Sequence, residues 1–291
     1  MDQNTAYTLI SKNFPDLAIS KIVKIGEGTG NIAYEVNDNL IFRFPKGPAN
    51  QVQLAQEIIL QPVLGRFSTL PYPKFDYLPA DHSFVGYEKL QGNPLILEMA
   101  HFDSWEAFAE QISNFLNQLH SIPKNKLNNL NILIEDKSFS DWQAHSLPFY
   151  EKTKHLIPSQ YYPEIEEFFN SKPQNQSFDK VLCHNDLGIE HILVTSDKVS
   201  GIIDWGGVAI ADPACDFARI YRDVGPKILD MVIAKYDTTP ANRGQIRERA
   251  IFYGKCLIFE DLYCGIREDE YLQKSLKALT WMFEPSPNLK N

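Results

Sequence analysis

Residues 183–193 read CHNDLGIEHIL, and residues 204–217 read DWGGVAIADPACDF. Charged and imidazole side chains of this kind are costly to bury unless they are paired, hydrogen-bonded or bound to metal. A single aspartate is most often a solvated turn residue. The combination of H-x-D, a second histidine and then I-I-D-W-G favours a charged site at the ends of strands instead.

The apolar runs before these stretches indicate where the aspartates lie in the fold. VLC leads into His184 and Asp186, and VSGIID ends at Asp204. We therefore expect Asp186 and Asp204 at neighbouring strand ends of one small sheet. Two carboxylates held close together cannot both stay ionised without a nearby cation. Magnesium prefers a few oxygen ligands and leaves its other positions to water and phosphate, so the pattern predicts a magnesium site.

The composition narrows the class of protein. The chain has 291 residues, 44% of them hydrophobic and 22% charged, with a net charge of -9. These values are typical of a soluble enzyme, and the acidic charge disfavours nucleic acid and anionic membranes as partners while favouring a cationic small molecule. The four cysteines form no C-x-x-C pair, and neither a signal peptide nor a membrane span is evident. We expect a soluble cytoplasmic protein, as a monomer.

The patterning predicts an α+β fold with two lobes. Residues 1–90 contain a short helix over 5–14, strands at KIVKI, NIAYEV and LIFRF, and a further strand in FVGYEKLQG. Between them NQVQLAQEIILQPVLGRF has a helical period on Val52, Ala55, Ile59 and Val63, although Pro62 limits or kinks it. The expected result is a small antiparallel sheet with a helix packed on it.

The second part of the chain is predicted to be mostly helical. Residues 91–98 are expected to form a hinge, and residues 99–291 a larger lobe that carries the two acidic loops. SWEAFAEQISNFLNQLHSI is an amphipathic helix with Ser104 as its N-cap, and further helices are expected over about 140–170, 226–237 and 243–283. A cleft between two such lobes is the usual place for a ligand.

H-N-D-x-x-x-x-H-I-L followed by G-I-I-D-W-G-x-x-x-x-x-D-P-x-x-D-F resembles the catalytic and metal loops of the aminoglycoside phosphotransferase family, which has a protein-kinase-like fold. Within the family the chain is most similar to the 2''-aminoglycoside enzymes, and next to the macrolide phosphotransferases. I-G-E-G-T-G-N-I-A-Y, L-I-F-R-F-P-K and F-E-D-L-Y-C-G-I extend the resemblance over nearly the whole chain. It implies magnesium-dependent phosphoryl transfer from ATP or GTP, and antibiotic resistance.

The resemblance also implies roles for individual residues. Asp186 matches the catalytic aspartate that orients or deprotonates the attacking hydroxyl, and His184 matches the histidine that braces its loop. Asp204 matches the aspartate that binds magnesium. His191 stands where protein kinases have a metal-binding asparagine; because oxygen is the preferred donor for magnesium, ligation of the metal, contact with a phosphate and simple packing all stay open.

The nucleotide side rests on a glycine cluster and one cation. Gly26, Gly28 and Gly30 form G-x-G-x-G between two predicted strands, where backbone amides can approach phosphates. Kinases hold the phosphates with a lysine on the third strand and position it with a helix glutamate. This chain has Arg43 at that place, with Lys46 as the alternative cation. Either Arg43 holds the phosphates or the register slips and Lys46 does; we favour Arg43. The apolar neighbours of Arg43, Phe42 and Phe44, lie on the opposite face of the strand, which disfavours Arg43 as an ordinary solvated strand residue.

Further nucleotide contacts follow from the resemblance. Glu57 matches the partner glutamate of the phosphate-binding cation. G-Y-E-K-L-Q-G resembles the hinge, where backbone groups of Glu88 to Leu90 would bind the purine and Tyr87 takes the gatekeeper position. Tyr87 as a selector for GTP and as an ordinary core residue are equally compatible with the pattern. Ile203, next to the metal aspartate, is assigned to the same nucleotide site.

The acceptor side is less defined. A polycationic aminoglycoside needs carboxylates, and the candidates are Asp216, Glu260, Asp261 and Glu268, together with Asp212. Each alone is more often a solvated surface group, and Asp216 is a candidate for bracing the metal loop. Two alternatives stay open: a macrolide or other small-metabolite kinase of the same fold, and a catalytically silent pseudokinase that serves as a binding module.

Overall fold

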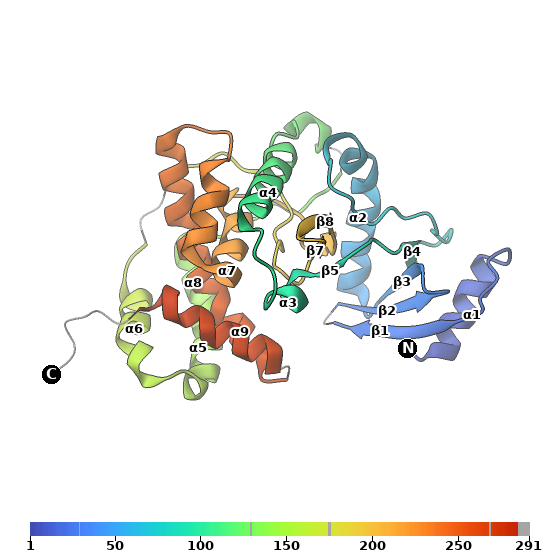
Figure 1. The fold of residues 1–291 in the computed structure, drawn as a ribbon, viewed down its shortest axis with the longest axis horizontal. Coiled ribbons are helices and arrows are strands. Elements are labelled where there is room, and N and C mark those ends of the chain that lie inside the picture. Colours follow the sequence, from blue (N-terminus) through green and yellow to red (C-terminus); the bar gives the residue numbers. More distant parts are fainter. Residues whose placement is uncertain (29, 129, 174–175, 268, 285–291) are drawn as a thin grey trace.

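The structure is a computed structural model that describes residues 1–28, 30–128, 130–173, 176–267 and 269–284. Figure 1 shows two lobes side by side, with the amino-terminal sheet on one side and a bundle of helices on the other. The α+β, kinase-like fold predicted from the sequence is confirmed. The exact lobe limits at residues 90 and 98 stay a prediction. Among the described residues no helix combines the length and apolarity that a membrane span requires.

The amino-terminal lobe is built on one antiparallel sheet in the order β1-β2-β3-β4. Its elements are α1 (Gln3–Asn13), β1 (Ile22–Glu27), β2 (Asn31–Val36), β3 (Leu40–Pro45), α2 (Pro48–Phe67) and β4 (Val85–Glu88). Strand β2 alternates between buried and half-buried residues, as expected for a strand with one face in the core. Phe42 and Phe44 lie in that core with residues of α1, so Arg43 between them points to the opposite face of β3.

Helix α2 differs from its predicted packing. It buries Leu54, Glu57, Leu60 and Leu64, whereas Val52 and Ile59 are 60% and 43% exposed. The helix is present as predicted, but Val52 and Ile59 do not face the core, although Val63 packs against it. Leu54, Leu60 and Leu64 form a second apolar face, and this face, which also carries Glu57 in its ion pair with Arg43, is the buried one. The helix also continues through Pro62.

The carboxy-terminal lobe combines two small sheets with a bundle of helices. Its strands are β5 (Asn93–Pro94), β6 (Val181–Cys183), β7 (Ile192–Thr195), β8 (Lys198–Ile202) and β9 (Ala209–Ala211). Its helices are α3 (Leu95–Glu98), α4 (Trp105–His120), α5 (Phe139–Thr153), α6 (Tyr162–Asn170), α7 (Ala214–Ala234), α8 (Pro240–Gly265) and α9 (Asp269–Met282). Helix α4 begins after Ser104, as predicted, although this side chain makes no capping hydrogen bond.

Two predicted helices are interrupted and one is longer than expected. The segment 140–170 contains α5 and α6, and the segment 243–283 contains α8 and α9. The predicted helix over 226–237 is the second half of α7, which begins at residue 214 and kinks at Gly225, where φ is 84° just before Pro226. A glycine with positive φ followed by proline bends a helix, since the proline lacks the N–H that would close the next turn.

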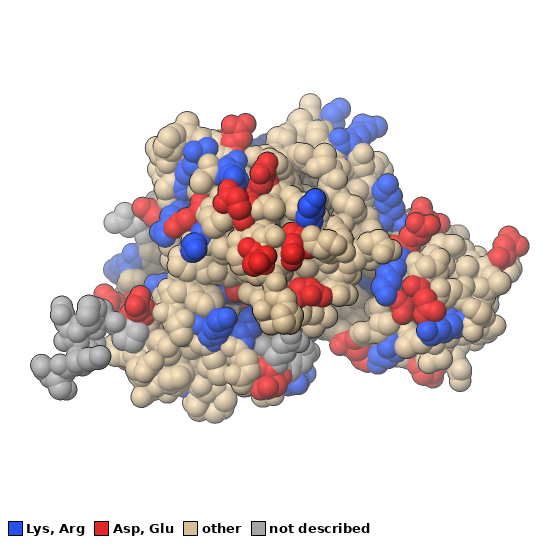
Figure 2. All heavy atoms as spheres, viewed as in Figure 1, with Lys and Arg blue, Asp and Glu red and all other residues tan. Residues whose placement is uncertain are grey.

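Charged residues are mixed over the surface rather than gathered by sign. Figure 2 shows acidic and basic side chains interspersed on the face that both lobes present in Figure 1. Such a face does not form the extended basic surface that tracks a nucleic acid backbone.

Candidate active site

The loop predicted to be catalytic, residues 184–191, follows β6 and is called the catalytic loop; the loop that carries Asp204 after β8 is called the metal loop. His184 ties the two loops together. The Nε2 of His184 donates to the carbonyl of Ile203 at 3.1 Å, and its Nδ1 accepts from the backbone N–H of Asp186 at 3.3 Å. Burial lowers the pKa of His184, so the neutral imidazole serves as donor at one nitrogen and acceptor at the other. One ring thereby fixes the distance between the loops that carry Asp186 and Asp204.

The two loops do not leave a common sheet, which corrects the prediction. Strand β6, which leads to Asp186, pairs with β9, whereas β8, which leads to Asp204, belongs to the sheet β5-β7-β8. The two strands had been assigned to one sheet because they follow each other closely in the sequence. The loops are instead joined by His184 and by a hydrogen bond of 2.9 Å from the N–H of Ile203 to the carbonyl of His191.

His191 lies between the two acids. Its Nδ1 is 3.6 Å from Oδ2 of Asp186, and its Nε2 is 3.7 Å from Oδ2 of Asp204. Nδ1 also lies 2.8 Å from the carbonyl of Asp186, to which it donates. Burial opposes protonation of His191, but the charges of Asp186 and Asp204 outweigh it and raise its pKa. The structure therefore brings the two predicted acids and the second histidine to one place.

Backbone strain marks both acidic loops. Asn185 has φ 62°, and Asp204 has φ 60° with ψ 71°, which is the left-handed region. Residues other than glycine adopt this conformation at a cost of about 1–3 kcal/mol, and such outliers concentrate at functional sites. Gly207 supports the arrangement, because a Cβ there would come within 3.1 Å of the Cβ of Asp186. The metal loop can approach the catalytic loop this closely only without a side chain.

The acids open into a cavity of about 520 Å³ between the lobes. Its wall is formed by residues of both lobes, namely Gly26, Gly28, Gly30, Asn31, Ala33, Arg43, Asn50, Gln53, Asp186, Glu190, His191, Asp204, Gly206, Gly207, Arg219, Asp261, Cys264 and Tyr271. Within the described residues the carboxylate of Asp204 accepts no hydrogen bond; Nε2 of His191 lies 3.7 Å from it and the guanidinium of Arg43 lies 3.8 Å from it. An exposed carboxylate with free oxygens, next to a second carboxylate, fits the ligands that magnesium prefers.

The glycine cluster lines the same cavity. Gly26 pairs with Ala33 of β2 directly after a bulge in β1, and a Cβ on Gly26 or Gly28 would meet no atom within 4 Å. These two positions therefore leave open space in the cavity beside the backbone. A Cβ on Gly30 would instead approach the amide of Asn50 to 2.8 Å. Thr29, between them, lies outside the described residues.

Arg43 and not Lys46 faces the cavity. Nη2 of Arg43 is 2.5 Å from Oε1 of Glu57, and both side chains are nearly fully buried. Burial raises the pKa of Glu57, while the charge of Arg43 opposes that rise. Lys46 instead pairs with Glu27 at 3.0 Å in the glycine loop, where both side chains are partly exposed. The geometry thus gives Arg43 the position between the helix glutamate and Asp204.

The predicted hinge residues lie apart from this cavity. Tyr87 is buried in β4, and burial raises its pKa to about 12. Glu88 and Leu90 line a separate depression of about 370 Å³ formed with the end of α2 and the loop that follows it. Ile203 is half-buried beside Asp204. None of these four lines the cavity of the two acids, and their contact with a purine stays a prediction.

The structure places the predicted acceptor acids in different environments. Asp261 lines the cavity, whereas Glu260 on the same helix is exposed and lies outside its wall. Asp216 is fully buried, so its assignment to the acceptor site is wrong. Glu268 lies outside the described residues. The sequence could not separate Glu260 from Asp261, because adjacent side chains on a helix point about 100° apart and the sequence does not determine which side of the helix faces the cavity.

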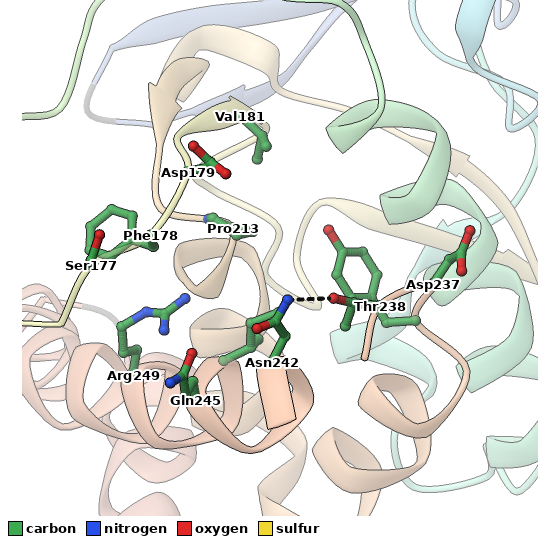
Figure 3. A pocket seen from close by; sticks show the side chains of 12 residues that line it. Ser177, Phe178, Asp179, Val181, Pro213, Asp237, Thr238, Asn242, Gln245 and Arg249 are labelled. Atoms are coloured by element: carbon green, nitrogen blue, oxygen red, sulfur yellow. Dashed lines mark hydrogen bonds between the residues drawn. The ribbon is translucent and has the colours of Figure 1, made fainter. Parts of the chain in front are cut away.

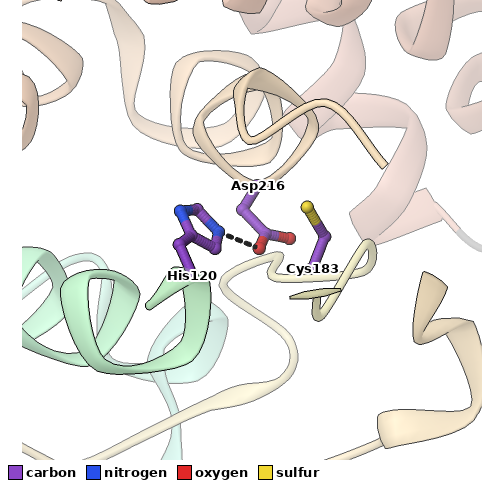
Figure 4. Close-up of side chains that lie close together, drawn as sticks. All are labelled: His120, Cys183 and Asp216. Atoms are coloured by element: carbon purple, nitrogen blue, oxygen red, sulfur yellow. Dashed lines mark hydrogen bonds and ion pairs between the residues drawn. The ribbon is translucent and has the colours of Figure 1, made fainter. Parts of the chain in front are cut away.

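Asp216 braces the catalytic loop from behind. Its carboxylate accepts from the backbone N–H of His184 at 3.1 Å and of Asn185 at 2.7 Å, and from Nε2 of His120 at 3.0 Å. Figure 4 shows this histidine and the thiol of Cys183 close to the carboxylate. Burial raises the pKa of Cys183 well above its usual value, so the thiol stays protonated and is a poor metal ligand. The cluster is a support for the loop that carries Asp186, rather than for the metal loop.

A second depression of about 340 Å³ is lined by the residues around Phe178, by the segment after α7 and by the first turns of α8 (Figure 3). Arg249 in its wall is already bound to Asp212, with N–O distances of 2.6 and 3.1 Å, and its guanidinium lies over the ring of Phe178. Because Arg249 is committed to this buried pair, it is not available to bind a phosphate there. Asp212 therefore also serves the fold and not the acceptor site.

Three cavity residues were missed from the sequence. Nη1 of Arg219 on α7 is 3.1 Å from Oδ1 of Asp186. Burial opposes ionisation of Asp186, but the charges of Arg219 and His191 outweigh it and lower its pKa to about 2. Glu190 and Tyr271 line the acceptor end. The helical spacing in DPACDFAR places Arg219 about one turn after Asp216, but it does not indicate that the side chain of Arg219 faces the cavity.

A two-lobed kinase-like fold whose cleft joins a glycine loop, a buried Arg–Glu pair and two converging aspartates is that of a phosphotransferase. The chain belongs to the phosphotransferase enzyme family, whose model matches residues 21–249. An aminoglycoside 3'-phosphotransferase of Escherichia coli is 22% identical over 241 residues, covering 80% of this chain and 79% of the relative. This confirms the family and the enzymatic class predicted from the sequence.

Solved structures share the whole fold. The GDP and kanamycin complex of an APH(2'') enzyme superposes with a TM-score of 0.77 at 24% identity, covering 96% of this chain and 98% of that chain. A type I macrolide 2'-phosphotransferase superposes with a TM-score of 0.66 at 16% identity, covering 96% and 98%. At these identities the likeness concerns the fold.

Proposed function

We propose that the protein transfers the γ-phosphoryl group of ATP or GTP to a hydroxyl of a cationic small molecule, with an aminoglycoside as the first candidate acceptor. The observation that carries the proposal is the meeting of Asp186 and Asp204 across His191 in one interlobe cavity. A catalytic aspartate and a metal-binding aspartate facing the same space are the central requirement of kinase chemistry.

The donor is held at the glycine-loop end. Gly26 and Gly28 leave room for phosphate oxygens beside the backbone, and Arg43 offers a guanidinium held in place by Glu57. Asp204, with His191 next to it, would hold magnesium, which neutralises charge on the phosphates. Arginine can bind two phosphate oxygens at once, so its replacement of lysine is compatible with the same role.

Asp186 orients the acceptor. Its carboxylate lines the cavity, with Arg219 at Oδ1 and His191 3.6 Å from Oδ2, so it can accept a hydrogen bond from the acceptor hydroxyl. Positioning for in-line attack and electrostatic stabilisation supply most of the rate acceleration in such enzymes. Asp261 and Glu190 at the same end supply negative charge toward a cationic acceptor.

Two observations support the acceptor class. One structural neighbour was solved with GDP and kanamycin, and the chain itself carries two carboxylates at the acceptor end of its cavity. A macrolide is the second candidate, because a macrolide 2'-phosphotransferase shares the fold over nearly the full length of both chains. Both compounds offer a hydroxyl near an amine.

The test is a phosphorylation screen with kanamycin, a macrolide and a simple amino alcohol, each with Mg-ATP and Mg-GTP. Asp186→Asn and Asp204→Asn should each reduce turnover by at least about a hundredfold, in line with the loss of a catalytic carboxylate. Asp179→Asn, an exposed aspartate outside this cavity, is the matched control. Turnover of either active-site variant close to that of the wild type contradicts the proposal, provided that thermal melts show all variants folded.

A further inference from the structure

The acceptor end of the cavity is backed by cations of the chain itself. Behind Glu190 and Asp261, which line the cavity, lie Arg222 and Lys274, whose side chains are 0% and 10% exposed. Arg222 makes ion pairs of 3.1 Å with Glu190 and 3.0 Å with Asp261. The acids expected to bind a cationic acceptor are therefore already paired.

Lys274 is held in the way in which proteins hold an organic ammonium ligand. Its Nζ lies 3.4 Å from Oε2 of Glu190 and 3.1 Å from Oδ1 of Asp223, and it stands 4.7 Å above the ring centroid of Tyr271. Two carboxylates and an aromatic face form a favourable environment for an ammonium group. Since Glu190 and Tyr271 also line the cavity, this ammonium position adjoins the space that the acceptor would occupy.

We propose that Lys274 is a specificity-determining residue of the acceptor site. Its ammonium fills a position, formed by Glu190, Asp223 and Tyr271, that an amine of the acceptor could otherwise occupy. Acceptors that carry an ammonium group at this place have to compete with Lys274, and acceptors that lack one do not. The inference rests on the proposed function, of which it specifies the acceptor.

The charge balance at this end agrees with a restricted acceptor. Apart from His191, the described residues here supply four carboxylates and three cations, so part of the negative charge that would attract a polycation is already balanced within the chain. The carboxylates are those of Asp186, Glu190, Asp223 and Asp261, and the cations are Arg219, Arg222 and Lys274.

Lys274 can be removed without dismantling the network. Asp223 keeps two hydrogen bonds from Arg222, at 2.7 and 2.9 Å, and one from the N–H of Ile189 at 3.0 Å. Oε1 of Glu190 keeps its contact with Arg222. Loss of Lys274 therefore frees mainly Oε2 of Glu190, the oxygen that an acceptor amine could then bind.

The experiment measures kanamycin binding by titration calorimetry, with magnesium and a non-hydrolysable GTP analogue present. Lys274→Met and Lys274→Gln are compared with the wild type and with Lys277→Met, which removes an exposed lysine from the same helix. An amine of kanamycin gains a charge-assisted hydrogen bond to Glu190, so both Lys274 variants should bind kanamycin about tenfold more tightly, which corresponds to about 1.4 kcal/mol. Lys277→Met should stay within about twofold of the wild type. Because an ion pair is gained, the difference should shrink as salt is added.

The outcomes separate this inference from the proposed function. Unchanged, weaker or undetectable binding by both folded Lys274 variants overturns the role of Lys274, and so does an equal gain in Lys277→Met. Tighter binding by the Lys274 variants supports the inference even if no acceptor is phosphorylated, in which case only the proposed function fails. Lys274→Gln keeps a polar group near Asp223, so it serves as the test if Lys274→Met does not fold.

Discussion

Replacement of Asp216 should be one of the most destabilising single changes in the chain. Three donors converge on its carboxylate, namely the backbone N–H groups of His184 and Asn185 and Nε2 of His120. Asp216→Ala leaves all three unpaired; the donors of His184 and His120 are buried and that of Asn185 is partly buried, and each unsatisfied buried donor costs about 1–3 kcal/mol. From the two buried donors alone the expected loss is about 2–6 kcal/mol, a large fraction of the roughly 5–15 kcal/mol by which proteins of this kind are stable.

Asp216→Asn should have a smaller effect because it keeps the volume and one acceptor oxygen. If that oxygen takes the place of Oδ2, it still accepts from His184 and His120, and only the N–H of Asn185 faces a donor. One unsatisfied group corresponds to about 1–3 kcal/mol. Both variants should also lose phosphoryl transfer under conditions where they are folded, because the catalytic loop is held by the same bonds.

Urea unfolding followed by tryptophan fluorescence measures these losses. Asp230→Ala is the matched control on the same helix, because Asp230 is half exposed and pairs with Arg247 at the surface, where an ion pair contributes less than about 1 kcal/mol. The expected order of destabilisation is Asp216→Ala, then Asp216→Asn, then Asp230→Ala. If Asp216→Ala unfolds within about 1 kcal/mol of the control, the carboxylate is not the support described here.

Three further predictions concern the loops and the buried charges. Arg43→Lys should raise the KM for the nucleotide about tenfold. Arg43→Met should also lose about 3–5 kcal/mol of stability, because it leaves Glu57 buried without its cation. Steady-state kinetics and urea unfolding measure the two effects, and equal behaviour of both variants contradicts the argument. Asn185→Gly should be as stable as the wild type whereas Asn185→Ala should lose about 1 kcal/mol in the same unfolding assay, since φ is 62° at this position. Burial opposes ionisation of Glu190, but the charge of Arg222 outweighs this effect and lowers the pKa of Glu190 to about 2. The stability that Glu190 contributes should therefore be complete above about pH 4.5 and fall as the pH drops toward 2. Melting curves from about pH 6 to 2 should show a weaker acid dependence for Glu190→Gln than for the wild type.

Local patterns sufficed for the fold and for the centre of the site. Glycines, alternating strands and the H-N-D and I-I-D-W-G stretches each carry their information within about ten residues, and the structure joins Asp186, His191 and Asp204 as those stretches indicate. The expectation that Arg43 is not an ordinary solvated residue also followed from a local feature, its apolar neighbours on the opposite face of β3. Short-range periodicity is the strongest signal that a single sequence offers.

Contacts between distant segments could not be predicted. The buried position of Glu57 on α2 depends on its pairing with the strand residue Arg43, which hydrophobic periodicity does not register. The buried role of Asp216 requires His120, nearly a hundred positions earlier in the chain. Lys274 was missed for the same reason, since its partners Glu190 and Asp223 come from two other segments. In a single sequence, a buried ionic side chain cannot be distinguished from a surface residue until its partner is known.

The catalytic loop is fixed by buried polar groups on its inner side, and this arrangement has a functional consequence. Asp216 holds its first two N–H groups, His184 ties it to the metal loop, and Asp223 holds the N–H of Ile189. Each support is itself paired with a second buried group, so the loop can keep Asn185 in a strained conformation that isolated chain would not adopt. The chain's own side chains thus position Asp186, and in enzymes preorganisation of this kind is a main source of electrostatic stabilisation.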